Sequence, residues 1–448
     1  MEEEFSNHSN NESFEEVLNS YMSRRQMIVG GLAGAALSFM GGSKVSALTS
    51  NAPQVAAAAK KAKIGFTSIP LQLGAMPTIA PEYDYSVLIP WREKLDGSGK
   101  SFDYAGFTAE DQAKSIGIGH DGISYFGDNK KGMLCINHEY GTTPHLMGKA
   151  VPASIDDVKL SQTAHGVSVV MIENTKTGWK MVKSAKNRRI HGNTAVKFSG
   201  PAAKSEMLVN PAGNPMQGTL NNCANGETPW GTYLTCEENF NGYFGTNDKA
   251  WKPNTDQARY GLAAGGFGYE WHKFDARFDL SNAGYVNEIN RFGWVVEIDP
   301  NNPKQVPVKR TALGRIKHEG ATVVEGKDGR AVVYMGDDER FDYVYKFVSK
   351  DSWKKMIAAG KSPLDEGTLY VAKYNDNGTG EWLELSTKNP LLAGWSIEKI
   401  LIQTRSAADA VGATKMDRPE WVAAGPGGNM YVTLTNNTQR GTVGKASV

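Results

Sequence analysis

The sequence predicts an all-β domain, and two patterns support that prediction. From Lys63 onward, short apolar runs rich in β-branched residues alternate with Gly, Asn and Asp, and no long amphipathic helical period interrupts them. Two hairpins are expected, pairing 166–172 with 179–182 and 321–324 with 331–335, because turn-forming residues separate the alternating strands in both. Further expected strands are 294–298, 343–348, 368–374, 382–385 and 430–434, and short helices are expected at 109–115 and 352–359.

Strands that recur with turns along most of a chain favour a β-propeller over a single open sheet, because radial repetition leaves few exposed strand edges. We expect about six blades, within the range that propellers span. Two packed sheets forming a sandwich are the alternative architecture. No repeat consensus is evident by eye, so the blade count has no direct support in the sequence.

The first 47 residues are predicted to be a twin-arginine export signal. Ser-Arg-Arg-Gln-Met-Ile at 23–28 precedes a weakly apolar run rich in Gly and Ala, and Val-Ser-Ala at 45–47 provides the small residues that a signal peptidase reads. The apolar run is shorter than the roughly 20 residues that a membrane-spanning helix needs. Residues 48–62 are then a linker, and 63–448 form the folded domain. We therefore expect a periplasmic or secreted protein that uses the twin-arginine export machinery, without stable membrane insertion.

The composition is that of a globular protein with a small ligand. The chain has 40% apolar and 22% charged residues, and its 49 Lys and Arg balance 48 Asp and Glu to a net charge of +1. This balance gives no reason to expect nucleic acid as a partner. Only three cysteines occur, which are Cys135, Cys223 and Cys236. They are too few for a disulfide framework and leave at least one thiol free for chemistry.

Side chains of metal-ligand type gather where predicted strands end, at 137–140, 221–240, 317–321, 336–342, 417–421 and 433–437. Each group alone has a simple structural explanation, because Asp and Asn after a strand form turns and a lone Cys packs as a small hydrophobe. Glu237 and Glu238 are harder to explain in this way. Adjacent strand residues point to opposite faces, so one of the two must lie on the core side, where a buried carboxylate needs a metal or another cation.

Taken together, these groups predict a metal site for phosphoester cleavage. A thiolate with several carboxylates could hold ferric iron, while neighbouring carboxylates and carbonyls suit calcium. Zinc is less suitable, because the sequence has no Cys-x-x-Cys pair and no His-x-x-x-His spacing. Arg418 and Arg340 could bind phosphoryl oxygens through their forked donors.

The same residues resemble the signature of a known family, the PhoX-type alkaline phosphatases. The resemblance lies in Asn222-Cys223, Pro229-Trp230-Gly231-Thr232, Thr235-Cys236-Glu237-Glu238-Asn239, His318-Glu319-Gly320-Ala321, Gly336-Asp337-Asp338 and Asp417-Arg418-Pro419-Glu420, within a span of 137–437. It implies a propeller fold, twin-arginine export and hydrolysis of phosphomonoesters to release inorganic phosphate. The family uses a cluster of Fe³⁺ and Ca²⁺ ions bridged by an oxo group near the propeller axis, so the expected nucleophile is this oxo or hydroxo group rather than a side chain.

Carried onto this sequence, the resemblance also implies roles for individual residues. Cys236 is the expected iron ligand, with Cys223 as the alternative. The expected carboxylate ligands are Glu319 and Glu420, together with the less specific candidates Glu237, Glu238, Asp337 and Asp338, which suit calcium. The expected substrate-binding residues are Arg418, followed by Arg340 and Asn239. Family members usually continue well beyond 435–437, whereas this sequence ends at Val448, so we expect a last blade that is incomplete or closed differently.

Two other functions stay open beside the phosphatase. The early end of the sequence suggests a catalytically silent propeller that binds a ligand or partner. A calcium-dependent hydrolase of lactones or other esters would need carboxylates and Asn around one Ca²⁺ but no thiolate.

Overall fold

The computed structural model describes residues 69–70, 74, 76–99 and 106–442. The predicted signal region at 1–47 and the linker at 48–62 lie outside these residues. The chain divides into two compact units, Met1–Val87 and Leu88–Val448. The described part of the first unit consists of turns and irregular segments. The second unit contains every described helix and strand.

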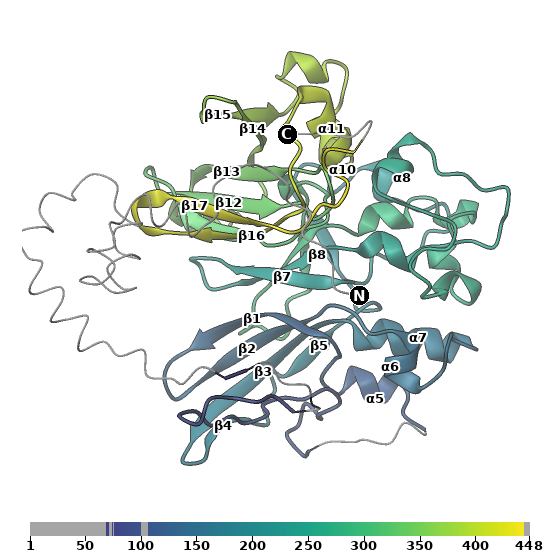
Figure 1. The fold of residues 1–448 in the computed structure, drawn as a ribbon, viewed down its shortest axis with the longest axis vertical. Coiled ribbons are helices and arrows are strands. Elements are labelled where there is room, and N and C mark those ends of the chain that lie inside the picture. Colours follow the sequence, from purple (N-terminus) through teal and green to yellow (C-terminus); the bar gives the residue numbers. More distant parts are fainter. Residues whose placement is uncertain (1–68, 71–73, 75, 100–105, 443–448) are drawn as a thin grey trace, which may run out of the picture. The chain divides into compact units, whose positions relative to one another are not determined.

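Three five-stranded sheets and one hairpin form the framework of the second unit (Figure 1). The first sheet contains β1 (His120–Gly127), β2 (Lys131–His138), β3 (Gly166–Thr175), β4 (Gly178–Met181) and β5 (Arg188–Ile190). The second contains, in spatial order, β6 (Lys197–Ser199), β10 (Val308–Arg310), β9 (Val295–Ile298), β8 (Tyr233–Glu237) and β7 (Asn222–Glu227). The third runs in chain order through β11 (Thr322–Glu325), β12 (Arg330–Gly336), β13 (Val344–Ser352), β14 (Gly367–Tyr374) and β15 (Gly380–Leu385). The hairpin consists of β16 (Pro419–Ala424) and β17 (Met430–Leu434).

Short helices connect the strands and cover the ends of the sheets. The α-helices are α5 (Ala109–Ala113), α6 (Thr143–Met147), α7 (Ile155–Ala164), α8 (Thr255–Arg259), α9 (Trp353–Ala358), α10 (Ile397–Ile402) and α11 (Thr404–Val411). Single 3₁₀ turns occur at Glu206–Leu208, Phe240–Tyr243, Trp271–Lys273, Ala276–Phe278, Ala283–Tyr285, Glu288–Arg291, Thr311–Leu313, Pro390–Leu392 and Pro426–Gly428. No helix in the described ranges has the length and apolar character that crossing a membrane requires.

The predicted β content is confirmed, as are both predicted hairpins. β3 pairs with β4 and β11 pairs with β12, each pair antiparallel. Every pairing between the described strands is antiparallel except that of β6 with β10, which is parallel. None of the sheets closes into a barrel. The helices α6, α7, α8, α10 and α11 were not predicted, because each spans only five to ten residues, too few to give a long helical period.

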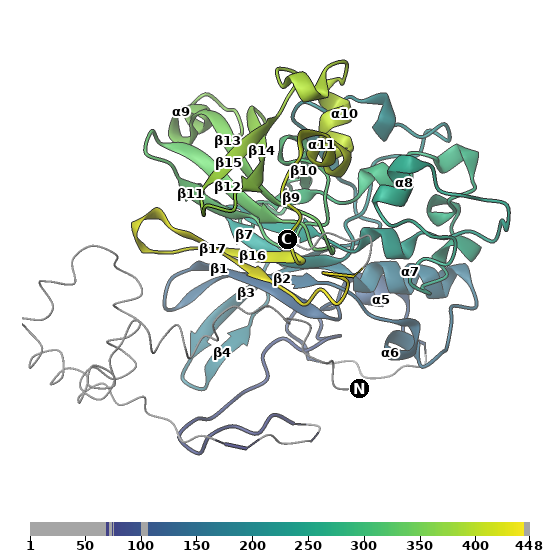
Figure 2. The same cartoon turned by 45° about the horizontal axis from the view of Figure 1, so that its top comes forward.

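Two close backbone approaches join the second sheet to the third and the third sheet to the hairpin β16–β17. A β-carbon at Gly226 of β7 would lie 1.9 Å from the carbonyl oxygen of Ala321, which precedes β11. One at Gly336 of β12 would lie 2.2 Å from the carbonyl oxygen of Glu420 in β16. Glycine is therefore required at both places, because any side chain would force the backbones apart. Two views show the hairpin β16–β17, in yellow, lying along β12 (Figure 1, Figure 2).

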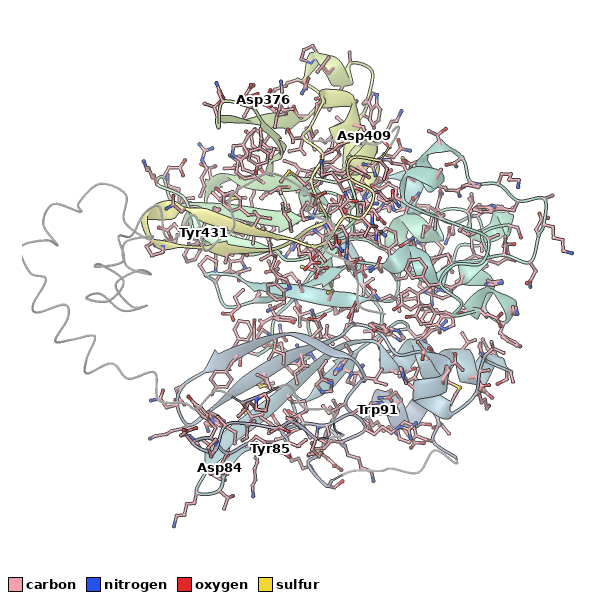
Figure 3. The ribbon with its side chains drawn as sticks, viewed as in Figure 1. Asp84, Tyr85, Trp91, Asp376, Asp409 and Tyr431 are labelled. Atoms are coloured by element: carbon pink, nitrogen blue, oxygen red, sulfur yellow. The ribbon has the colours of Figure 1, made fainter. Side chains whose placement is uncertain are left out.

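The largest hydrophobic core lies between the second and third sheets and includes Trp294, Tyr345 and Phe347. A second, aromatic core forms where α7 meets the long segment between β8 and β9, around Tyr243 and Trp271. Arg259 of α8 joins this segment to α11 and to the connection between β12 and β13, because its guanidinium bonds both Asp409 and Asp342. Asp409 lies on α11 and is labelled in Figure 3.

We predict that protonation of one buried histidine, His165, destabilises the protein in mild acid. Burial lowers the pKa of His165 to about 4, and its Nδ1 lies 2.6 Å from the carbonyl oxygen of Ser161 while Nε2 has no hydrogen-bond partner. Because the unfolded histidine binds a proton near pH 6.5 and the folded one does not, the stability contributed by this residue is lost as the pH falls from about 6.5 to about 4. The full effect is roughly 3 kcal/mol.

Urea unfolding measured at several pH values between 7 and 4 tests this prediction. The variant His165→Gln is expected to show a shallower loss of stability with acid than the wild type. The control His145→Gln changes an exposed histidine and is expected to keep the wild-type slope. An unchanged slope in His165→Gln would contradict the assignment.

Candidate metal centre

Cys223 lies at the centre of a group of carboxylates. Its Sγ is 3.0 Å from Oδ2 of Asp121 and 3.0 Å from Oε1 of Glu319. Two sets of ligand atoms share this thiol, one from Asp121, Glu139 and Cys223 and the other from Cys223, Glu238 and Glu319. Within each set all ligand atoms lie within 4.8 Å of one another. We call these five residues the Cys223 cluster.

The cluster is assembled from equivalent places in successive hairpins. Each hairpin is closed by a backbone hydrogen bond from a residue after its second strand to a residue before its first strand. The four donor and acceptor pairs are Glu139 to Gly119 (2.8 Å), Glu238 to Asn221 (3.0 Å), Asp338 to Lys317 (3.0 Å) and Thr435 to Arg418 (3.1 Å). We call these closures the first to fourth corners. The residues two positions after the four acceptors are Asp121, Cys223, Glu319 and Glu420.

Every corner therefore brings one side chain from each strand of its hairpin to the same place. Three corners carry two side chains of ligand type each, whereas the fourth pairs Glu420 with Thr435. Backbone geometry is shared as well, because Gly119, Asn221 and Arg418 have φ values of 62°, 49° and 48°. Such values are costly for Asn and Arg, and they persist where the surrounding structure holds them.

Burial and mutual repulsion disfavour the charged forms of Glu139, Glu319 and the Cys223 thiol. Burial, reinforced by Asp338 and Glu420, raises the pKa of Glu319 to about 8. Burial and the nearby Asp121 raise the pKa of Glu139 to about 7. The pKa of the Cys223 thiol is raised by burial and then by Glu319.

In the cluster, the carboxylate of Glu238 has the fewest contacts that offset the cost of its burial. Burial and the neighbouring Glu319 raise the pKa of Glu238 well above its usual range, against the opposing effect of the Lys317 ammonium. Its Oε1 is buried and has no hydrogen-bond partner. An unpartnered carboxylate oxygen beside a thiol and a second carboxylate is a fitting place for a bound cation, which would reverse these pKa shifts.

Glu237, the neighbour of Glu238, points the other way into an ion pair. Its carboxylate lies 2.7 Å from Nζ of Lys309, and it accepts hydrogen bonds from the amides of Gly293 (2.9 Å) and Trp294 (3.0 Å). All of these groups are buried. The structure therefore places Glu237 in a saturated set of protein donors rather than in the Cys223 cluster.

Asp337 and Asp338 also point to different partners. Asp337 is buried against the guanidinium of Arg405, whose Nε lies at 2.9 Å, and it also accepts from the amide of Lys317. Asp338 binds Nε and Nη2 of Arg418, both at 2.8 Å. Asp338 thus reaches the cluster as the partner of Arg418, whereas Asp337 anchors the turn before it.

The two candidate cysteines have different surroundings. Cys236 is fully buried in the largest hydrophobic core, near Trp294, and belongs to neither set of ligand atoms. Cys223 belongs to both. A bulge in β7 between Asn222 and Asn225 shifts the register at this point. The geometry therefore moves the preference for a metal-binding thiol from Cys236 to Cys223, which was the alternative.

The expected substrate-binding residues lie around the fourth and second corners. The Arg418 side chain is 29% exposed, and its Nη2 lies 3.7 Å from Oε1 of Glu420. Arg340 pairs through its backbone with Asp417, and its Nε is buried without a hydrogen-bond partner. Asn239 donates its side-chain amide to Glu238.

Asp121 was not among the residues expected from the sequence, and Glu139 stood in the ligand-type group at 137–140 without an assigned role. The signal that could have found them is the spacing of the corners, since the four acceptor residues follow one another at intervals of about 100 residues. In each corner, an acidic residue or Cys stands two positions after the acceptor residue. The pattern is too short to stand out without the hairpins that frame it.

We predict opposite effects of two matched substitutions in adjacent residues. Glu237→Gln is expected to lower the free energy of unfolding by about 3–5 kcal/mol, because the buried ammonium of Lys309 loses its anion. Glu238→Gln is expected to leave the stability of the metal-depleted protein unchanged or higher, because it removes one of several repelling carboxylates. Urea unfolding in the presence of a chelator measures both. Equal losses in the two variants would refute this division of roles.

Comparison with known proteins identifies relatives of this chain. Residues 64–448 match the family model described as alkaline phosphatase PhoX. Among solved structures, the chain is similar to Pseudomonas fluorescens PhoX in complex with vanadate, a transition state analogue, with 44% sequence identity and a TM-score of 0.79. The match covers 85% of this chain and 69% of that chain. No curated protein sequence matches the chain.

Proposed function

This chain belongs to the PhoX family of alkaline phosphatases, and we propose that its phosphomonoesterase activity resides in the Cys223 cluster together with Arg418. The predicted phosphatase function is confirmed by the family match and by the 44% identity to a solved PhoX. The silent propeller and the lactone hydrolase are not favoured. The observation that carries the location of the site is the convergence of one thiol and four carboxylates from separate hairpins.

The substrate phosphate binds at Arg418 in this proposal. Asp338 occupies Nε and Nη2 of the guanidinium, which orients the side chain and leaves it part-exposed beside Glu420. The hydrogens that remain on Nη1 and Nη2 form a second fork, and such a fork suits the tetrahedral oxygens of a phosphoryl group. The solved relative binds vanadate, a transition state analogue, which supports a phosphoryl-transfer site in this family. Arg340 and Asn239 are further candidates, Arg340 as a second cation near the phosphate and Asn239 as the residue that orients Glu238.

The donor set of the cluster fits iron and calcium. Cys223, Glu238 and Glu319 would hold the iron, since a thiolate is a soft ligand that selects a transition metal. Asp121 and Glu139 would contribute hard oxygen ligands for calcium. Glu420 would add a carboxylate from the fourth corner. When bound, such cations offset the negative charge of the phosphoryl group and activate the attacking oxygen.

We also propose that the four corner hairpins are the inner strands of propeller blades and that the chain is exported by the twin-arginine route. The close approaches of β7 to Ala321 and of β12 to Glu420 support a radial arrangement of these hairpins. The twin arginines and small residues of 1–47 support the export route. Export of an already folded chain suits a protein that takes up its metals before leaving the cytoplasm.

Two cysteine variants test the location of the site. Cys223→Ala is expected to reduce p-nitrophenyl phosphate turnover by roughly 100-fold or more and to lower the iron content, because it removes the proposed metal ligand. Cys236→Ala is expected to cost about 1–2 kcal/mol of stability through a small cavity, with turnover and iron retained in the folded protein. Steady-state kinetics and elemental analysis of iron and calcium measure both effects. Loss of iron in Cys236→Ala with full iron in Cys223→Ala would overturn the proposed site.

A further inference from the structure

The fourth corner differs in charge from the other three. The second-strand position of the corner is Glu139, Glu238 and Asp338 in the first three corners, and it is the neutral Thr435 in the fourth. The turn position is Gly119 and Asn221 in the first two corners and is cationic in the last two, where Lys317 and Arg418 stand. The fourth corner thus combines one acid with one cation and one hydroxyl, whereas the first carries two acids.

The hydroxyl of Thr435 has a specific contact. Its Oγ1 donates a hydrogen bond to Oε1 of Glu420, the same oxygen that lies 3.7 Å from Nη2 of Arg418. The backbone amide of Thr435 is fixed at the same time by the carbonyl oxygen of Arg418 at 3.1 Å. Thr435 therefore holds the carboxylate of Glu420 from one side while its own backbone is tied to the phosphate-binding arginine.

We propose that Thr435 is a specificity-determining residue that makes the fourth corner the place where the phosphate dianion binds. This inference rests on the proposed function, because it takes Arg418 as the phosphate ligand. An acid at position 435, as in the other corners, would place a second negative charge beside Glu420 and repel the incoming dianion. A neutral hydroxyl removes that repulsion and orients Glu420 so that Arg418 stays available to the substrate.

Three substitutions at Thr435 separate charge from hydrogen bonding. Thr435→Glu recreates the acid of the other corners and is expected to raise KM and the inhibition constant of inorganic phosphate at least about 10-fold, with a smaller change in kcat. Thr435→Val keeps the shape but loses the hydroxyl, and is expected to raise KM by a smaller factor. Thr435→Ser keeps the hydroxyl and is expected to retain the wild-type KM and phosphate inhibition constant.

A matched control places the same charge outside the corner. Thr433 lies two residues earlier on β17, is exposed, and contacts the carbonyl oxygen of Trp421 rather than Glu420. Thr433→Glu is expected to leave KM and phosphate inhibition unchanged. Equal effects of the two glutamate substitutions would overturn the proposal, because they would show a general effect of charge on the hairpin.

Direct binding and metal content complete the experiment. Phosphate binding to the purified holoenzyme is measured by calorimetry, and iron and calcium are measured in every variant. Weaker phosphate binding in Thr435→Glu with unchanged metal content supports the proposal, and lost metal with unchanged phosphate affinity overturns it. The variant Arg418→Ala separates this inference from the proposed function. If Arg418→Ala raises KM while Thr435→Glu does not, only the role of Thr435 fails, and if Arg418→Ala changes neither constant, the proposed phosphate site fails.

Discussion

Asp121, Glu139, Glu238 and Glu319 hold their carboxylates around the thiol of Cys223. Burial and repulsion between like charges raise the pKa values of Glu139, Glu238 and Glu319 and so disfavour their ionisation. The mutual repulsion of these carboxylates makes the arrangement unfavourable by itself, so other parts of the protein must hold it in place. It is imposed by hairpins that are fixed elsewhere, through their corner hydrogen bonds and through the hydrophobic cores that join the second sheet to the third and to the first. The rest of the molecule can therefore be understood as a support that keeps acids together until cations bind between them.

In two pairs of adjacent acidic residues, the first residue anchors the backbone and the second faces the site. In the pairs Glu237–Glu238 and Asp337–Asp338, the first residue enters a buried ion pair, with Lys309 and Arg405 respectively. The second residue faces the site, either in the Cys223 cluster or as the partner of Arg418. Both pairs lie where a strand ends, at the end of β8 and directly after β12, so the buried ion pair of the first acid fixes the backbone that carries the second. The buried pairs thus contribute position rather than chemistry.

Local patterns in the sequence predicted many of the strands and, within the Cys223 cluster, Glu238 and Glu319, and long-range packing determined the rest. Alternating apolar runs were sufficient for the hairpins β3–β4 and β11–β12, and the adjacent acids correctly indicated that one of Glu237 and Glu238 is buried toward a cation. The choice between Cys223 and Cys236 was not predictable in this way, because nearness in sequence to Glu238 favoured Cys236, whereas the bulge in β7 and the contact with Glu319 involve separate sheets. The position of Asp121 likewise depends on how the first sheet packs against the second.

The left-handed backbone at the corners shows how the support and the site are linked. Gly119 adopts this conformation freely, whereas Asn221 and Arg418 do so at a cost of about 1 kcal/mol or more each. In both residues the side chain that makes the conformation costly also makes the bonds that offset it. Asn221 donates to the hydroxyl of Tyr243 at 3.0 Å and accepts from the amide of Asn239 at 2.7 Å, while Arg418 binds Asp338 through two nitrogens. Strain at the turn is therefore balanced by bonds to the residues that shape the site, so a change in those bonds alters the direction of the strand and of the ligand it carries.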